Sequence, residues 1–142
     1  MNKSPGKGPI SIPLGVIGGS GAYDLLTNGA LGENVDTITL ETPFGKSAPI
    51  HHFRAGNLEY LFLSRHGEKD YSVTAPFVNY RANICALKEC GVERIISWSG
   101  PGIINPSFKP GEYVLPSDII DETKNRKTTF FKNRGLGFIR HD

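Results

Sequence analysis

Three short polar or glycine-rich stretches, each placed after an apolar run, hold the residues that could do chemistry. They are residues 18–21 in "VIGGSG", Arg65-His66 in "LFLSRHG" and Ser99-Gly100 in "IISWSG". Glycines let backbone N–H groups converge, a serine hydroxyl adds a donor, and an arginine fork holds an oxyanion at two points. Histidine can donate a hydrogen bond or carry charge. Singly, each stretch is equally well explained as a turn or a surface salt bridge, but together they favour an oxyanion site.

The glycine loop fits an anion loop better than three related motifs. A dinucleotide fingerprint counted from Gly19 requires a glycine where Asp24 stands, and a P-loop requires a Lys-Ser or Lys-Thr pair that is absent. The nucleophile elbow G-x-S-x-G fails at its last position, which is Ala22. What remains is a loop whose backbone amides and Ser20 hydroxyl face an anion.

The apolar runs before these stretches predict strands that bring them together. Residues 14–17 indicate a short buried strand, "LEYLFLS" a strand in the middle of a sheet, and "VERIISWS" a further strand. Gly56-Asn57 marks a hairpin turn. Ligands gather at the carboxyl ends of strands in such sheets, so we expect the three stretches to share one site.

A helix is predicted between the second and third of these strands. Pro76 suits its first turn and Gly91 its C-terminal stop. Apolar residues follow at spacings of three and four, namely Phe77, Tyr80, Ile84 and Leu87. The fold class is therefore α/β, with a mixed central β-sheet flanked by helices.

Composition indicates an ordinary globular domain. The chain has 142 residues, of which 38% are hydrophobic and 21% charged, and a formal net charge of +2. That charge gives no reason to expect a nucleic-acid or membrane partner, and no apolar run approaches the roughly 18 residues of a membrane span. Residues 1–13 are basic and rich in Pro and Gly without an apolar core, which predicts a flexible leader rather than a signal peptide.

The two cysteines predict neither a disulfide nor a metal site. Cys85 and Cys90 lie in the expected helix at a spacing that turns them about 140° apart around its axis. Two reduced thiols fit a cytoplasmic protein.

Six stretches, in this order, resemble the N-terminal half of the methylthioadenosine phosphorylase branch of the trimeric purine nucleoside phosphorylase family. They are "GVIGGSGAYD", "ETPFGKSAP", "LSRHGEKDY", "VNYRANICALKECGVERII", "PGEYVLPSDIID" and "TTFF". The contiguous Arg65-His66 is similar to the methylthioadenosine branch. The resemblance implies that residues 14–142 form the phosphate-binding half of a nucleoside phosphorylase-like domain, apparently truncated.

The resemblance also implies an activity and a ligand set. Family enzymes cleave a purine nucleoside with inorganic phosphate as co-substrate, release a free base and a sugar 1-phosphate, and need no metal or organic cofactor. The implied phosphate ligands are Ser20, Arg65, His66, Ser99 and the backbone of Gly100. No catalytic side chain beyond these is assigned. The expected partners are the purine nucleoside, phosphate, and either further copies in a trimer or a complementing C-terminal half.

The sequence departs from the family pattern in three places. Ser99-Gly100-Pro101 follows the bulky Trp98 where the family usually has Ser or Thr followed by Ala. Asp70 or Tyr71 stands where a second histidine is common. The chain also ends before the family's contacts to the purine, which leaves adenine and 6-oxopurine, and methylthioribose and ribose, open as substrate groups. The alternative to an enzyme is a non-catalytic, truncated phosphate-binding or oligomerising module.

Overall fold

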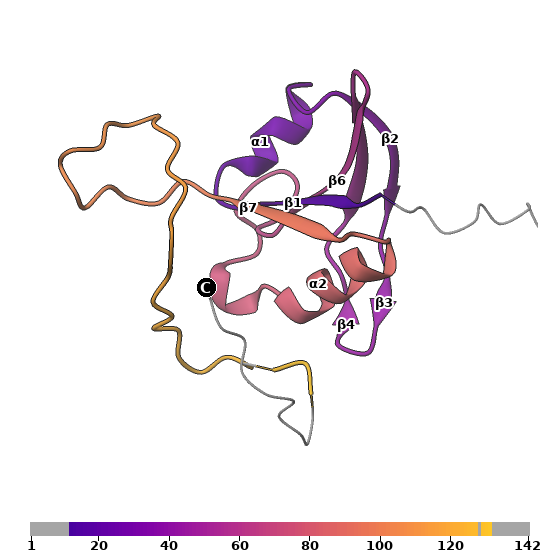
Figure 1. Cartoon of the computed structure of the whole chain (residues 1–142). Coiled ribbons are helices and arrows are strands. Elements are labelled where there is room, and N and C mark those ends of the chain that lie inside the picture. Colours follow the sequence, from indigo (N-terminus) through magenta and orange to yellow (C-terminus); the bar gives the residue numbers. More distant parts are fainter. Residues whose placement is uncertain (1–11, 128, 132–142) are drawn as a thin grey trace, which may run out of the picture. The chain divides into compact units, whose positions relative to one another are not determined.

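The computed structural model describes residues 12–127 and 129–131 (Figure 1). The chain divides into two compact units, residues 1–100 and residues 101–142. Within the described residues, all helices and strands belong to the first unit. The residues predicted to form the anion site, which end at Gly100, therefore all lie in one unit.

A five-stranded mixed sheet forms the centre of the first unit, in the order β2-β5-β6-β1-β7. β1 (Leu14–Gly18) runs parallel to both β6 (Leu58–Ser64) and β7 (Arg94–Trp98). β5 (Ile50–Ala55) is antiparallel to β6, and β2 (Glu33–Ile38) is antiparallel to β5. The mixed sheet predicted from the sequence is confirmed.

Two shorter features complete the strands of the first unit. β3 (Glu41–Thr42) and β4 (Gly45–Lys46) form a separate two-stranded ribbon. The predicted hairpin turn joins β5 to β6, with Ala55 opposite Leu58 and Gly56 at a φ of 62° that favours glycine. β6 lies between β5 and β1, and its side chains pack into a hydrophobic cluster on each face of the sheet, which explains why its sequence is apolar on both faces.

The two helices cover opposite faces of the sheet (Figure 1). On one face Ala22 of α1 (Ala22–Thr27) packs against aromatic side chains of β5 and β6. On the other face Ala86 and Leu87 of α2 (Tyr80–Glu89) pack against aliphatic side chains of the same strands. The aromatic cluster contains Phe53, Tyr60 and Phe62, and the aliphatic cluster contains Ile12, Ile50, Leu61 and Leu63.

The predicted start of the second helix is wrong by four residues. Pro76 belongs to a short 3-10 turn, η1 (Ala75–Phe77), and α2 begins at Tyr80. Asn79 caps α2, because its side-chain oxygen accepts a hydrogen bond from the Ala82 N–H at 3.3 Å. Phe77 is consequently off the helix and 81% exposed. The predicted stop is confirmed, with Gly91 at a φ of 84°.

The packed chain begins before residue 14. Ile12 is only 5% exposed and belongs to the aliphatic cluster. The Pro13 carbonyl accepts hydrogen bonds from the N–H groups of Glu93 and Arg94, at 2.9 and 3.0 Å. These contacts attach the start of β1 to the start of β7, while residues 1–11 of the predicted leader lie outside the described part of the chain.

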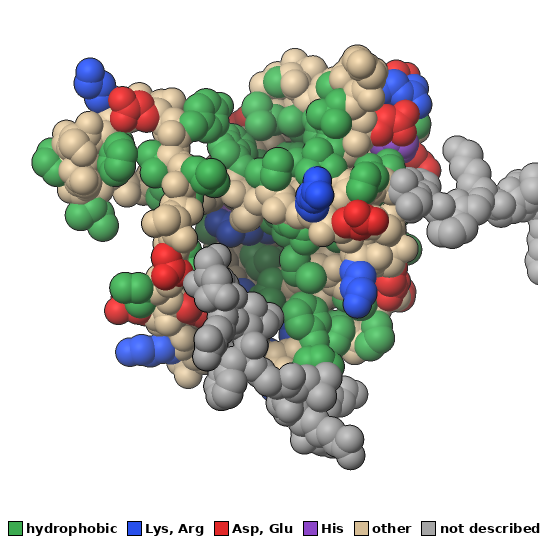
Figure 2. All heavy atoms as spheres, in the orientation of Figure 1, with side chains coloured by type: hydrophobic (Ala, Val, Ile, Leu, Met, Phe, Trp, Pro, Cys, Tyr) green, Lys and Arg blue, Asp and Glu red, His purple; other side chains and the backbone are tan. Residues whose placement is uncertain are grey.

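The described residues of the second unit, 101–127 and 129–131, form turns without a helix or strand. Many of its hydrophobic side chains are exposed, and Figure 2 shows such side chains in green on this segment. The most exposed are Ile104, Tyr113, Leu115 and Ile120. Across the described residues of both units, no helix is long and apolar enough to span a membrane.

Both cysteines are free thiols, as the helical spacing predicted. Cys85 lies on α2 and is half-buried, whereas Cys90 follows the helix and is buried. Burial raises the pKa of the Cys90 thiol, and the nearby Glu89 carboxylate raises it further. Burial also raises the pKa of Cys85, whose Sγ lies 3.5 Å from Glu89 Oε1. Neither residue is therefore suited to supply a thiolate at neutral pH.

Candidate functional site

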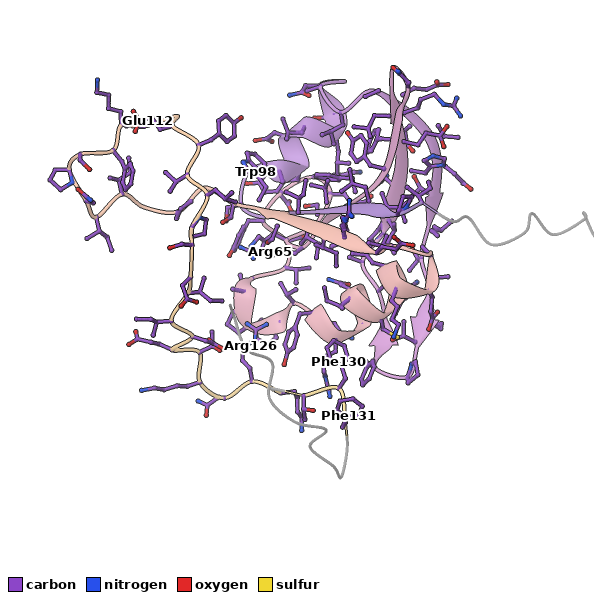
Figure 3. The ribbon with its side chains drawn as sticks, in the orientation of Figure 1. Arg65, Trp98, Glu112, Arg126, Phe130 and Phe131 are labelled. Atoms are coloured by element: carbon purple, nitrogen blue, oxygen red, sulfur yellow. The ribbon has the colours of Figure 1, made fainter. Side chains whose placement is uncertain are left out.

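Strand register brings the three predicted stretches to one edge of the sheet. Gly18, the last residue of β1, pairs with Ser64 of β6 on one side and with Trp98 of β7 on the other. The residue after each strand, Gly19, Arg65 and Ser99, therefore leaves the sheet beside its neighbours. In Figure 3 the labelled Arg65 and Trp98 lie at this same end of the sheet. The convergence predicted from the sequence is confirmed for these three strand ends.

Backbone hydrogen bonds extend the strand alignment into the loops. The Arg65 N–H donates to the Gly18 carbonyl at 3.1 Å, and the Gly19 N–H donates to the Trp98 carbonyl at 2.7 Å. These bonds fix where the Arg65 and Ser99 side chains begin relative to the glycine loop.

Gly19 lies in close contact with both neighbouring loops, a role that sequence reasoning did not assign. A Cβ atom at Gly19 would lie 2.7 Å from Ser99 Cβ and 3.1 Å from the Arg65 Nη2 atom. Real Cβ atoms do not approach a neighbouring carbon to 2.7 Å, so any larger residue here would force a neighbouring group to shift. The guanidinium of Arg65 thus lies against the backbone of the glycine loop.

The glycine loop itself is a tight turn before α1. The Ala22 N–H donates to the Gly19 carbonyl at 3.1 Å, and Gly21 has a φ of 81° and a ψ of −10°. These angles are those of the third residue of a type II turn, which glycine prefers. Ser20 is the second residue of the turn and is exposed, so its hydroxyl is accessible to a ligand.

His66 lies behind Arg65 and is almost completely buried, with 1% of its surface exposed. Its Nε2 accepts a hydrogen bond from the Arg65 Nε–H at 3.0 Å. Its Nδ1 lies 2.8 Å from the Val73 carbonyl oxygen. Both ring nitrogens are therefore engaged by the protein, while Arg65 is only partly buried.

Ser99 and Gly100 complete the predicted set and are both exposed. Ser99 packs closely against Gly19, whereas a Cβ atom at Gly100 would meet nothing within 4 Å. The backbone at Gly100 is therefore open to a ligand on the side where a larger residue would carry its side chain.

Two residues of the loop after His66 contact buried histidines, and sequence reasoning assigned neither contact. Tyr71 stacks on the His66 ring with centroids 4.3 Å apart and planes inclined by 28°. Glu68 Oε1 lies 2.7 Å from Nε2 of His51 on β5, an ion-pair distance at an angle that does not make a hydrogen bond. Tyr71, one of the two residues that stand where a second histidine is common, therefore contacts His66.

The described residues hold no cluster of three or more His, Cys, Asp or Glu side chains that could bind a metal ion. The groups that follow the three strand ends are instead the Arg65 guanidinium, the exposed Ser20 and Ser99 side chains and the open backbone of Gly100. Such a set matches an oxyanion, with the fork of Arg65 as its cation.

A family profile described as "Phosphorylase superfamily" matches residues 13–142. The 6-oxopurine nucleoside phosphorylase of Pyrococcus furiosus is 44% identical over 118 residues, which make up 83% of this chain and 42% of that protein. The S-methyl-5'-thioadenosine phosphorylase of Thermococcus kodakarensis is 40% identical over 127 residues, or 89% of this chain and 47% of that protein. The chain thus spans less than half the length of these two relatives.

A solved structure with a similar fold is the methylthioadenosine phosphorylase of Schistosoma mansoni in complex with tubercidin. It aligns with a TM-score of 0.53 and 33% sequence identity, over 61% of this chain and 29% of that one. The resemblance first seen in six short stretches extends over nearly all of the chain in the profile match. The chain belongs to the phosphorylase superfamily.

Proposed function

We propose that this chain is the phosphate-binding half of a purine nucleoside phosphorylase, acting on 5'-methylthioadenosine or a related purine nucleoside. In this reaction an oxygen of inorganic phosphate bonds to the anomeric carbon of the sugar while the bond from that carbon to the purine nitrogen breaks. The bonding electrons leave with the purine, which takes up a proton. The products are the free base and a sugar 1-phosphate, and no metal or organic cofactor takes part.

The alignment of Gly19, Arg65 and Ser99 at adjacent strand ends carries this proposal. We assign the phosphate to this edge, with the terminal nitrogens of Arg65 on two of its oxygens. The hydroxyls of Ser20 and Ser99 and the backbone of Gly100 provide the other contacts. Fixed donors of this kind hold the attacking dianion in place and balance its charge as the sugar becomes cationic.

The substrate assignment draws on the relatives. The solved neighbour is named as a methylthioadenosine phosphorylase, and relatives at 40% and 44% identity are named for methylthioadenosine and for 6-oxopurine nucleosides. We therefore propose a purine nucleoside, with methylthioadenosine as the first substrate to test. We assign the contacts to the purine base to the part of these relatives that the chain does not span. Turnover would then require that part as well.

Association with other chains follows from the same proposal. We propose a trimer of phosphorylase subunits, or pairing with a complementing C-terminal half, as the active form. A cytoplasmic location fits the two free thiols, because disulfides are rare in reducing compartments.

Phosphorolysis by the purified chain tests the proposal directly. Methylthioadenosine, methylthioinosine, adenosine and inosine are assayed in parallel, with and without phosphate, alone and after addition of the C-terminal half of a relative. We expect phosphate-dependent release of base once the complementing half is present. An Arg65→Ala variant in the same complex should require a much higher phosphate concentration. Release of base that does not depend on phosphate would contradict the proposal.

The second candidate function is a non-catalytic module that binds phosphate or associates with other chains. The observation that favours it is the exposed apolar character of the described part of residues 101–142, where Leu115 is 96% exposed. A folded sample that binds phosphate but releases no base from any of the four substrates, with or without the complementing half, would support the module over the enzyme.

A further inference from the structure

We propose that His66 and Tyr71 are positioning residues for Arg65. Tyr71 holds the His66 ring in place, and that ring fixes the plane of the guanidinium that binds phosphate. The inference rests on the proposed function, since it assumes that Arg65 is a phosphate ligand.

The first step concerns the protonation of His66. A carbonyl oxygen only accepts hydrogen bonds, so the 2.8 Å contact with Val73 requires a proton on Nδ1. The Arg65 Nε–H only donates, so the 3.0 Å contact with Nε2 requires a lone pair there. These two contacts select one form of the ring, the neutral tautomer with its proton on Nδ1. His66 in this form has no N–H left for a phosphate oxygen.

The second step concerns what remains available on Arg65. Its Nε is directed back to His66, which leaves the two terminal nitrogens as a fork. One of these, Nη2, lies 3.1 Å from the position of a Cβ atom at Gly19 and so faces the glycine loop. A hydrogen bond at Nε restricts rotation of the guanidinium, and a preorganised fork loses less conformational entropy when it binds an oxyanion at two points.

The third step concerns what holds the imidazole. The Val73 N–H donates to the His66 carbonyl at 2.9 Å, and the Ser72 hydroxyl donates to the same carbonyl at 3.4 Å. Val73 therefore bonds to both the backbone and the ring of His66, which closes residues 67–72 into a loop. Gly67 permits this closure, because it adopts a φ of 114° and a Cβ atom there would overlap the Ser72 hydroxyl.

Tyr71, at the end of this loop, covers one face of the ring. Its stack on His66 is close, at 4.3 Å between centroids, yet 42% of Tyr71 remains exposed. A side chain that is nearly half exposed contributes little to the core. Its main contact of consequence is therefore the histidine that orients Arg65. The stack is made by the aromatic ring, so phenylalanine should replace tyrosine here without loss.

Phosphate affinity of the purified chain, measured by isothermal titration, tests the inference. The variants are Tyr71→Ala, Tyr71→Phe and Arg65→Ala, with Tyr113→Ala as the control because Tyr113 is 90% exposed and lies in the other unit. We expect Tyr71→Ala to weaken phosphate binding about tenfold, the size expected when a hydrogen bond to a charged group is lost. Tyr71→Phe should restore the affinity of the unmodified chain, and Tyr113→Ala should retain it.

The ring nitrogens of His66 provide a readout that does not depend on phosphate. Nitrogen-15 NMR of the unmodified chain at neutral pH should show His66 with its proton on Nδ1, and Tyr71→Ala should give a mixture of forms. A His66 ring protonated on Nε2 in the unmodified chain would overturn the inference without any variant. Equal phosphate affinity of Tyr71→Ala and the unmodified chain would also overturn it. Equal affinity of Arg65→Ala and the unmodified chain would instead overturn the proposed phosphate site, so the two failures are distinct.

Discussion

The N–H of Arg65 donates to the carbonyl of Gly18 at 3.1 Å, so the loops after β6 and β1 begin side by side. Gly18 is also level with Trp98 on the other side of β1. β1, which lies between β6 and β7, thus determines the spacing between the Arg65 guanidinium after β6 and the Ser99 hydroxyl after β7. The geometry of the candidate site depends on this alignment more than on any single side chain.

Gly19→Ala should impair both phosphate binding and folding. The new methyl group would lie 2.7 Å from Ser99 Cβ and 3.1 Å from Arg65 Nη2, so one of these groups must move. We expect phosphate affinity to fall by about tenfold, and the free energy of unfolding to fall by about 1–3 kcal/mol, as for other overpacked sites. Titration calorimetry and urea unfolding measure the two effects.

Gly102→Ala is the matched control, because a Cβ atom at Gly102 would meet nothing within 4 Å. This variant should leave both phosphate affinity and the free energy of unfolding unchanged. A Gly19→Ala chain that binds phosphate like the unmodified chain would contradict the close approach of the loops.

Arg65→Lys should show that the shape of the cation matters as well as its charge. Lysine keeps the positive charge but has neither the fork nor the Nε–H that bonds to His66 at 3.0 Å. We expect phosphate affinity to fall by about tenfold, and stability to fall by about 1–2 kcal/mol because the buried Nε2 of His66 loses its donor. Phosphate titration and urea unfolding check these values.

Arg54→Lys is the control for this exchange, since Arg54 lies on β5 in a surface ion-pair group with Glu33 and Glu59. It should leave phosphate affinity unchanged. If the Arg65→Lys variant has the same phosphate affinity as the unmodified chain, a point charge is sufficient and the bidentate contact is not needed.

Sequence reasoning located the strands, the hairpin and the strand-end loops because these depend on local patterns. "LEYLFLS" is apolar on both faces because each face of β6 packs under a helix, Leu61 and Leu63 on one side and Tyr60 and Phe62 on the other. Gly56 forms the hairpin turn, whose φ of 62° favours glycine. The positions of Arg65 and Ser99 followed from the ends of such runs. Residue type and strand position were therefore enough to gather most of the candidate site.

The features that were missed depend on partners far along the chain. Asn79 starts α2 in place of Pro76 because its side chain both caps the helix and bonds to the carbonyl of Phe44, 35 residues away. His66 is turned inward by Val73, and hydrophobic periodicity carries no information about that contact. The close approach at Gly19 likewise depends on Arg65 and Ser99, which follow two other strands, β6 and β7.

Asn79→Ala should destabilise the first unit through both of these bonds. The side-chain oxygen of Asn79 caps α2 at Ala82, and its Nδ2 donates to the Phe44 carbonyl at 2.9 Å. Loss of a cap costs about 1 kcal/mol, and loss of the second bond adds about 1 kcal/mol. Asn79→Asp keeps a cap acceptor and removes only the donor, so it should lose about half as much in the same urea unfolding experiment. Equal losses for the two variants would mean that the cap contributes nothing.

Glu59 should make folding stability fall at acidic pH. Hydrogen bonds from Arg54 and then from His52 lower the pKa of the Glu59 carboxyl, and these outweigh the opposing effect of burial. Because the pKa is lower in the folded chain than in the unfolded chain, ionised Glu59 stabilises the fold above the ordinary glutamate value of about 4.3. This contribution disappears as pH falls through the lower folded value. Urea unfolding of the unmodified chain and Glu59→Gln, compared between about pH 6 and pH 3, isolates the effect. The difference in stability between the two proteins should shrink as the pH falls, because glutamine has no proton to gain, and a constant difference would place the acid sensitivity on other carboxylates.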